Sequence, residues 1–429
     1  MKNKKEIYSL IYIILLLFAF LLLKENDLKV KYIRVGYYSY SFKYGGIERV
    51  FSVLINHLSK EKYFTFFLIT NSGILDGEYS VINKAKRISL YEKKINLYQA
   101  IEQEKIDILI YNYEDKEVEK LNKLNKTKVI FYNHSSFLFW IYRKHLYNIN
   151  DTVYKLYKNC KYVISLIPLE NNYLFKKWGI KSILMDNPTT YEFDKVIPSF
   201  LTTNNIILLG RGNDPVKRYE LPIKAMEFIS KEIPDCQMNI VSSININLQN
   251  FILKLKLENN VRFTGFSENI EIYLSNASLH ILSSLSESYP MALGEVKIFG
   301  IPSILCGLDH LALAKGGTII IYDDNPSTIA YWAIKILKNK DLRKKLGYDA
   351  RVSMKQRNNE IIAKKWTKLL LSVYYRDEKT YQELLNESNN KITIEQANNI
   401  LKNQLNLLKK RMPIFKNISF EKFISYSLI

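Results

Sequence analysis

Short apolar runs alternate with amphipathic runs along most of the chain. Continuous apolar runs are typical of strands that are buried on both faces, and helices between such strands imply that neighbouring strands are parallel. The pattern therefore predicts an α/β fold with doubly wound sheets. In the first half of the chain the expected strands are residues 32–38, 63–70, 87–90, 106–111, 128–133 and 162–166.

The alternation is interrupted once and then starts again. Residues 187–205 contain Pro188, Pro198 and many polar side chains, which is typical of a linker. Because the same pattern returns after this break, we expect two similar domains, each with its own sheet. The expected strands of the second domain are residues 206–210, 237–241, 261–264, 278–282, 303–306 and 318–321.

These patterns divide the folded part of the chain into four segments. They are a first Rossmann-like domain at residues 30–190, a linker at 191–205, a second Rossmann-like domain at 206–375 and a helical tail rich in Lys and Asn at 376–429. In the tail, apolar residues recur at helical spacing. The tail can pack on the body of the protein or lie on a membrane surface, and the sequence leaves both alternatives open.

The N-terminus has a different pattern. Residues 1–6 are basic, and residues 7–23 form an uncharged apolar run that would span roughly 25 Å as a helix, near the lower limit for crossing a bilayer. A cleaved signal peptide is the alternative, but no cleavage site with small residues follows. We therefore expect a single-pass transmembrane anchor. Basic residues flank it on both sides, so the charge pattern does not set its orientation.

Composition adds a large positive charge. Lys and Arg number 62 and Asp and Glu number 42, which gives a formal net charge of +20. Nucleic acid, an anionic membrane or an anionic donor substrate could each use this excess. The lysines are dispersed among Glu and Asn, and no nucleic-acid-binding motif is found, so nucleic acid is not an expected partner.

The three cysteines, Cys160, Cys236 and Cys306, lie far apart and next to apolar runs. This spacing suggests neither a disulfide framework nor a metal cluster. We expect buried free thiols, which fits a reducing compartment.

Two carboxylates eight residues apart stand out in the segment Glu-Ser-Tyr-Pro-Met-Ala-Leu-Gly-Glu at residues 287–295. An apolar strand leads into this segment and a helix leads out of it. Pro290 suits the first turn of that helix, and Gly300 suits its end. Glu287 should then lie on the loop after a strand, and Glu295 one to two turns into the helix. Ligands bind at this edge of open α/β sheets, and carboxylates there can accept hydrogen bonds from vicinal hydroxyls.

Three further features strengthen the case for a site. A strand-like run ends at Gly210 and continues as Arg-Gly-Asn-Asp-Pro-Val to Lys217. A Gly-Gly-Ile-Glu-Arg segment at residues 45–49 follows the first expected strand, and His134 ends another strand. Together with the paired carboxylates, these segments resemble the family-4 retaining glycosyltransferases, which have the GT-B fold of two Rossmann-like domains facing a cleft.

The resemblance extends from about residue 31 to about residue 375. The paired glutamates together with the Gly-Arg…Lys segment are fairly specific, whereas a Gly-Gly loop alone is a weak signal. The family usually has Gly after the first glutamate and Ala after the second, where this chain has Ser288 and Val296. Both changes leave the carboxylates in place.

The resemblance implies roles for residues of the second domain. Glu295 would hold the ribose hydroxyls of the nucleotide, and Glu287 would contact the donor sugar near its reacting carbon. The backbone N–H groups of Met291, Ala292 and Leu293 would face the sugar and the diphosphate. The alternative is that the two glutamates are ordinary surface carboxylates near a helix start, where the helix dipole favours acids.

Arg211 and Lys217 would neutralise the negative charge that develops on the leaving nucleoside diphosphate. Metal ions do this in other glycosyltransferases, so we expect neither a metal nor another cofactor here. Gly210 would let the loop approach the phosphates closely. Arg218 is a weaker neighbour that can face solvent, and surface cations on a loop are the alternative for the whole group.

On the first domain, Gly45 and Gly46 would approach the donor phosphate, and Arg49 would line the cleft on the acceptor side. His134 would contact a sugar hydroxyl near the reacting carbon and need not act as a general base. The structural alternatives are a tight turn that opens a helix and a histidine that caps a strand.

The resemblance implies a retaining glycosyltransferase, of the hexosyltransferase type, that moves a sugar from a UDP- or GDP-linked donor to a hydroxyl of a lipid-linked or surface-glycan acceptor. A catalytic part facing the cytosol fits the supply of nucleotide-sugar and the free thiols. Two alternatives remain at this point: a nucleotide-sugar epimerase of the same fold, and a non-catalytic protein that binds glycan or nucleotide.

Overall fold

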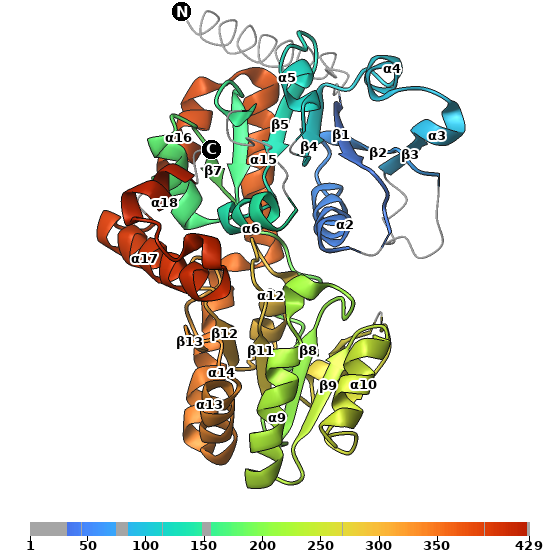
Figure 1. Cartoon of the computed structure of the whole chain (residues 1–429). Coiled ribbons are helices and arrows are strands. Elements are labelled where there is room, and N and C mark those ends of the chain that lie inside the picture. The colour runs from blue at the N-terminus through green and yellow to red at the C-terminus, as the bar shows by residue number, and fades with distance from the viewer. Residues whose placement is uncertain are drawn as a thin grey trace, which may run out of the picture.

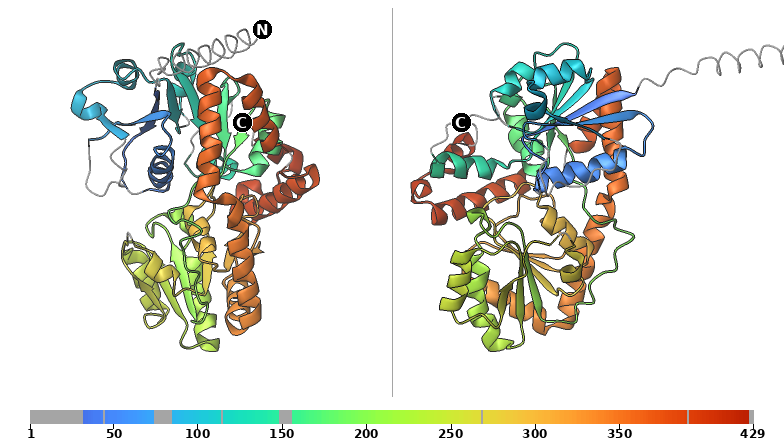
Figure 2. Two further views of the ribbon diagram at one scale, coloured as in Figure 1. Left: turned by 180° about the vertical axis from the view of Figure 1, so that it is seen from behind. Right: turned by 90° about the vertical axis from the view of Figure 1, so that its right-hand side faces the viewer.

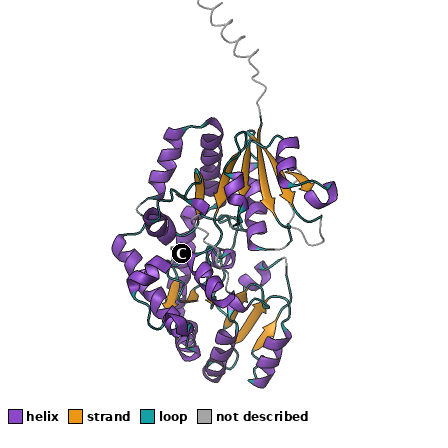
Figure 3. Ribbon diagram, turned by 45° about the horizontal axis from the view of Figure 1, so that its top comes forward, coloured by secondary structure: helices purple, strands orange, loops and turns teal. Residues whose placement is uncertain are grey.

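The computed structural model describes residues 32–43, 45–73, 85–113, 115–147, 156–267, 269–389 and 391–426. Two domains lie one above the other, and each is built around one parallel sheet with helices packed on it (Figure 1 and Figure 3). This arrangement confirms the two Rossmann-like domains that the sequence predicts.

The first sheet has seven parallel strands in the order β3-β2-β1-β4-β5-β6-β7. This is the doubly wound order, in which the chain starts in the middle of the sheet and later returns to build the other half. The strands are β1 (Ile33–Ser39), β2 (Phe64–Thr70), β3 (Ala85–Ser89), β4 (Ile108–Tyr111), β5 (Lys128–Tyr132), β6 (Tyr162–Ser165) and β7 (Ile183–Leu184).

Helices connect these strands. They include α4, where Asn96 and Gln99 form a capping box that satisfies the first free N–H groups of the helix. The helical segments are α2 (Gly46–Leu58), α3 (Leu90–Lys93), α4 (Leu97–Gln103), α5 (Glu117–Leu121), α6 (Phe137–Tyr147), the π-helix η1 (Glu170–Leu174) and α8 (Phe175–Lys177).

The second sheet repeats the same topology with six parallel strands in the order β10-β9-β8-β11-β12-β13. Its strands are β8 (Asn205–Leu209), β9 (Gln237–Val241), β10 (Val261–Phe263), β11 (Leu279–Leu282), β12 (Ser303–Cys306) and β13 (Thr318–Ile321). Its helices are η2 (Pro215–Lys217), α9 (Glu220–Glu232), α10 (Ile246–Lys254), α11 (Glu271–Leu274), α12 (Met291–Ile298), α13 (Pro326–Lys338) and α14 (Lys340–Met354).

Every strand expected from the sequence is present, with ends that differ by a few residues. The strand that the sequence analysis missed is β7, because its two residues are too short to give an apolar run. The helix after Glu287 also begins slightly later than expected. Pro290 is its N-cap residue, with a ψ of 113°, and Gly300 follows its end with a φ of 68°. Gly300 therefore fills the left-handed position that glycine favours.

After the short helix η3 (Lys355–Arg357), the chain returns to the first domain through α15 (Asn359–Tyr375), as Figure 1 and Figure 2 show. Trp366 of α15 is fully buried, and its ring lies 5.2 Å from that of Tyr132 at the end of β5. Although the sequence division places this helix in the second domain, the structure packs it on the first.

The tail forms α16 (Glu378–Ser388), α17 (Ile394–Arg411), η4 (Pro413–Phe415) and α18 (Phe420–Tyr426). One face of α17 joins an apolar cluster of the first domain that includes Phe131, Val163 and Leu174. The helix contributes Ala397, Leu401, Leu405 and Leu408 to this cluster. Of the two alternatives left open by the sequence, the structure shows the tail packed on the body.

Among the described residues, no helix combines the length and apolar character needed to cross a bilayer. The anchor predicted at residues 7–23 lies outside the described residues. Cys160, Cys236 and Cys306 are buried free thiols, as expected.

Shortening Leu401 to Ala tests the packing of the tail. Leu401 is fully buried in the first domain's core, so its truncation should lower the free energy of unfolding by about 2–5 kcal/mol. The matched control is Ile394→Ala at the start of the same helix, where the side chain is 72% exposed and a change within about 0.5 kcal/mol is expected. Urea unfolding followed by circular dichroism measures both. Equal small effects would contradict the packed tail.

Candidate active site

A cleft of ≈ 700 Å³ lies between the two domains. Its walls come from loops that follow the carboxyl ends of strands in both sheets, the position where open α/β sheets bind ligands. The loop after β1 supplies Gly45 and Gly46, and β5 is followed by His134. From the second domain, Arg211 and Lys217 follow β8, and the loop and helix after β11 supply Glu287, Met291, Ala292 and Glu295.

Lys217 and Glu287 pair directly in this cleft. The Nζ atom of Lys217 lies 2.5 Å from Oε1 of Glu287, and both side chains are less than one fifth exposed. Ser284 donates a second hydrogen bond of 2.7 Å to the same carboxylate oxygen. Lys217 ends the short helix η2, whose first turn is capped by the Asp214 side chain. The two charges were predicted to face the donor from different segments, and the structure brings them together.

Glu295 is almost completely buried in α12 and is reached from the other domain. Its Oε1 accepts a hydrogen bond of 2.9 Å from Arg49 and one of 2.5 Å from Thr190. A buried carboxylate needs such partners, because an unpaired charge away from water is costly. Arg49 was predicted to line the cleft on the acceptor side. In the structure it contacts the side chain predicted to hold the ribose.

Glycine is required at Gly210 by its backbone and by its neighbours. Its φ is 142°, and a Cβ there would lie 3.0 Å from the hydroxyl of Tyr219 and 3.2 Å from Cε of Lys217. Gly46 differs, because a Cβ there would meet nothing within 4 Å. The space beside Gly46 therefore opens into the cleft, whereas Gly210 lets the lysine lie close to the backbone.

His134 lies half-buried at the rim of the cleft, beside the rings of Tyr132 and Phe51. Burial lowers the pKa of His134 to about 3, so the ring is neutral near pH 7. Its Nε2 atom is buried without a hydrogen-bond partner among the described residues. A neutral imidazole with a free nitrogen can exchange a hydrogen bond with a hydroxyl group, and it is a poor base for a full proton transfer.

Arg211 is exposed at the edge of the predicted donor site. Its side chain is 74% exposed and lies 2.9 Å from Asp214, which is the local cap of η2. Arg218 shows the opposite behaviour. It was expected to be able to face solvent, but its side chain is only 15% exposed and is paired with Asp324. The expectation that Arg218 can face solvent is therefore wrong.

The helix start at Met291 matches the prediction in part. Met291 and Ala292 line the cleft at the first turn of α12, where backbone N–H groups have no partner within the helix. Leu293 does not line the cleft, and its N–H donates to the carbonyl of Pro290 at 3.1 Å. The N–H group of Leu293, which was predicted to face the donor, is therefore already bonded within the chain.

The sequence analysis assigned no role to two further residues of the site. Glu48 lines the cleft between Gly46 and Arg49, and burial raises its pKa. His310 reaches the site from the loop after β12, and its Nε2 lies 3.0 Å from the carbonyl oxygen of Glu287. Glu48 belongs to the Gly-Gly-Ile-Glu-Arg segment, but no role was predicted for it, whereas His310 lies in no predicted motif. Their positions follow only from the structure.

No group of three or more His, Cys, Asp or Glu side chains within the described ranges is arranged to hold a metal ion. Positive charge in the cleft comes instead from Lys217, Arg211 and Arg49.

Comparison with known proteins relates the chain to glycosyltransferases. Residues 191–353 match the family described as Glycosyl transferases group 1. An uncharacterised glycosyltransferase of Methanocaldococcus jannaschii is 24% identical over 287 residues, which cover 58% of this chain and 70% of that protein. The matched family segment contains the Lys217–Glu287 pair and Glu295.

Solved structures show the same architecture. Sucrose-phosphate synthase from Thermosynechococcus elongatus is similar with a TM-score of 0.68 at 17% identity, covering 80% of this chain and 99% of that chain. Anabaena HepE in complex with UDP and glucose is similar with a TM-score of 0.61 at 13% identity. The match covers 80% of this chain and 100% of that chain. The fold is GT-B. The match at residues 191–353 and the similarity to glycosyltransferases support a transferase.

The lowered pKa of His134 gives the stability a defined pH dependence. The pKa of His134 is lowered from the ordinary 6.5 to about 3, so the unfolded chain binds a proton there that the folded protein does not bind between these values. Stability contributed by the neutral ring is complete above pH 6.5 and decreases as the pH falls through this window. The thermal midpoint of the wild type should therefore fall more steeply between pH 7 and pH 5 than that of His134→Gln, with parallel curves above pH 7. Parallel curves over the whole range would contradict a neutral His134.

Proposed function

We propose that this glycosyltransferase uses a nucleotide-sugar donor, UDP- or GDP-linked, and transfers the sugar with retention of its anomeric configuration. The observation that carries the proposal is the Lys217–Glu287 pair beside Gly210, with Glu295 in the same cleft. The structure of Anabaena HepE in complex with UDP and glucose supports this class of donor for a protein of the same fold.

The diphosphate of the donor would bind between the loop after β8 and the first turn of α12. Lys217 would exchange part of its contact with Glu287 for a phosphate oxygen, and Arg211 has the freedom to close over the other oxygens, since its side chain is largely exposed. The two cations would stabilise the negative charge that develops as the bond between the sugar carbon and the phosphate oxygen breaks. These cations make a metal ion unnecessary for the step.

Glu287 and Glu295 would hold the neutral parts of the donor. A carboxylate accepts hydrogen bonds from two vicinal hydroxyls, which suits Glu295 to the ribose and Glu287 to the transferred sugar. To reach the ribose, Glu295 must share or release Arg49 or Thr190, which now occupy one of its oxygens. Binding of the donor would therefore be coupled to contacts between the two domains.

The acceptor would enter from the first domain, past His134 and the Gly45–Gly46 loop. The acceptor hydroxyl would attack the sugar on the face from which the diphosphate departs, and its proton would pass to the leaving phosphate oxygen. His134, held neutral, would orient a hydroxyl of the sugar. We propose a lipid-linked or surface-glycan acceptor, with residues 7–23 as the membrane anchor and the catalytic part facing the cytosol.

Nucleotide binding is the first test of the donor site. A ligand that binds only the folded state adds about 2.7 kcal/mol of stability at a hundredfold excess over its dissociation constant. We expect UDP or GDP to raise the thermal midpoint of the wild type, and Lys217→Met and Glu295→Gln to abolish the rise. Lys231→Met, an exposed lysine of α9, is the matched control and should keep it. If neither nucleotide shifts the folded wild type, the proposed donor class is wrong.

The anomeric configuration of the product tests the retaining mechanism. Incubation with the α-linked nucleotide-sugar that binds should release sugar whose first-formed anomer is α, as observed by proton NMR before mutarotation. The rate should be unchanged by EDTA, because the positive charge at the leaving group comes from the protein. A β anomer formed first would show inversion, and loss of activity with EDTA that Mg²⁺ restores would contradict the metal-independent step.

A further inference from the structure

We propose that Arg411, in the tail helix α17, is a positioning residue of the donor site and acts through Asp324 and Arg218 on Lys217. The inference rests on the proposed function of Lys217 as the cation that binds the donor diphosphate. It assigns a role in the donor site to a segment that lies outside the matched family region, residues 191–353.

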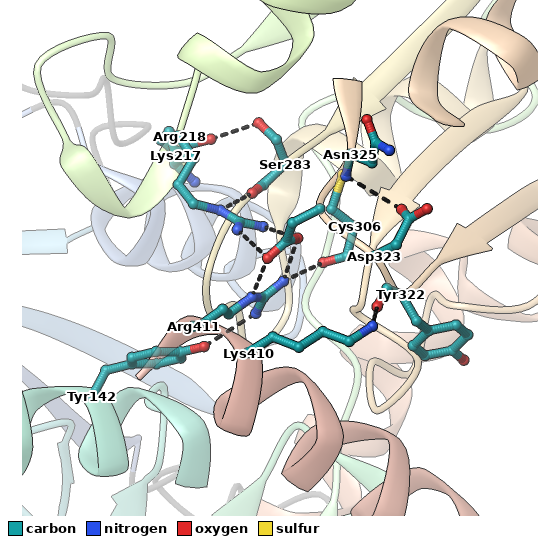
Figure 4. Close-up of polar contacts among 11 residues, drawn as sticks. Tyr142, Lys217, Arg218, Ser283, Cys306, Tyr322, Asp323, Asn325, Lys410 and Arg411 are labelled. Atoms are coloured by element: carbon teal, nitrogen blue, oxygen red, sulfur yellow. Dashed lines mark hydrogen bonds and ion pairs between the residues drawn. The ribbon is translucent and has the colours of Figure 1, made fainter. Parts of the chain in front are cut away.

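Asp324 is the centre of the network, because it is paired with both Arg218 and Arg411. Figure 4 labels Lys217, Arg218, Ser283 and Arg411, which belong to this network. Its carboxylate is held from one side by Arg218, with distances of 2.8 and 3.0 Å to the two oxygens. From the other side Arg411 binds the same two oxygens at 2.6 and 2.8 Å. Each arginine thus makes a forked contact, the geometry in which guanidinium pairs with carboxylate most strongly. The side chain of Arg411 is only 7% exposed.

The network ends at Lys217 through Ser283, the residue directly after β11. Arg218 donates from Nε to the carbonyl oxygen of Ser283 at 2.8 Å, and the Ser283 hydroxyl donates to the carbonyl oxygen of Lys217 at 2.6 Å. Ser283 is therefore bonded to both Lys217 and Arg218. The same loop continues to Glu287, the direct partner of Lys217. The network therefore holds the backbone segments that carry both Lys217 and Glu287.

The backbone at the two joined residues needs such support. Arg218 has a φ of 49° and Asp324 a φ of 50°. Residues other than glycine rarely adopt this left-handed backbone conformation. Strained conformations persist where the surrounding contacts define them, and they gather at functional sites. In this protein an ion pair connects the two strained residues, and one of them follows Lys217 directly.

Arg411 is itself held from the first domain. Its Nη1 lies 3.1 Å from the hydroxyl of Tyr142 in α6, and the apolar face of α17 is packed in the core of that domain. The same helix also bonds the second domain through Gln404, which donates to the carbonyl of Gly307 at 2.7 Å and to Asp309 at 2.6 Å. The tail helix α17 is therefore packed on the first domain and also holds residues of the second domain in place.

Hydrogen exchange tests the positioning without any ligand. In the full chain, Arg411→Met should make the amides of residues 211–218 exchange about tenfold faster, since a contact that couples neighbouring groups is lost. The control is Lys409→Met, which removes a cation from the same helix and should leave these amides unchanged. If Arg411→Met does not fold, Arg411→Lys replaces it, because lysine keeps the charge but cannot form the forked contact. Unchanged exchange in the folded variant overturns the proposal.

Nucleotide binding tests the consequence for the site. For the nucleoside diphosphate that binds the wild type, UDP or GDP, Arg411→Met should raise the dissociation constant about tenfold. The corresponding nucleoside, which lacks phosphates, should bind the variant and the wild type within about twofold. In a Lys217→Met background, the further change Arg411→Met should add less than about twofold, because both residues act on the same phosphate contact.

The outcomes separate the two proposals. Equal losses for nucleoside and nucleoside diphosphate, or fully additive losses in the double variant, would show that Arg411 supports only the fold, and would overturn the positioning role. If the wild type binds neither UDP nor GDP, the proposed donor class fails, and the exchange of residues 211–218 alone decides whether Arg411 positions the Lys217 loop.

Discussion

The cleft depends on the bonds between the two places where the chain crosses from one domain to the other. At the first crossing, the N–H of Thr189 donates to Asn359 at 2.9 Å, and at the return crossing the amide of Asn359 donates to the carbonyl of Thr189 at 2.8 Å. Both residues are buried. Each crossing therefore satisfies polar groups of the other, and the two crossings form one bonded unit. Thr190, the next residue, donates to Glu295, so the same unit places a carboxylate of the site.

The charges of the cleft are already paired in the absence of substrate. Lys217 is bonded to Glu287 within the second domain, and Glu295 is bonded to Arg49 across the domains. Buried charges without partners would destabilise the fold strongly. In the proposed function, the phosphates and hydroxyls of the donor would take over part of these contacts. The Arg49–Glu295 pair joins the two domains at the cleft.

The sequence predicted what depends on local pattern. The strands followed from apolar runs, and the positions of Glu287 on a loop and Glu295 in a helix followed from a strand, a proline and a glycine at fixed spacing. Arg49 and Glu295, in contrast, are separated by 246 positions, and their contact depends on how the domains face each other. Arg218 was misjudged for the same reason, since its partner Asp324 lies 106 positions away. His310 acts on the backbone carbonyl of Glu287, and no side-chain pattern reports such a contact.

The segment that matches the glycosyltransferase family does not contain all the residues that hold the proposed donor site in place. The tail lies outside that segment. Asp324 lies within the segment that matches the glycosyltransferase family, and Arg411 lies well beyond its end. A second domain without the tail would leave the half-buried carboxylate of Asp324 with Arg218 alone, free to turn toward water on the side that Arg411 now covers. Lysine would be a poor replacement there, because one guanidinium spans both carboxylate oxygens and still reaches Tyr142. The unit that positions Lys217 therefore includes a helix whose apolar face belongs to the core of the other domain.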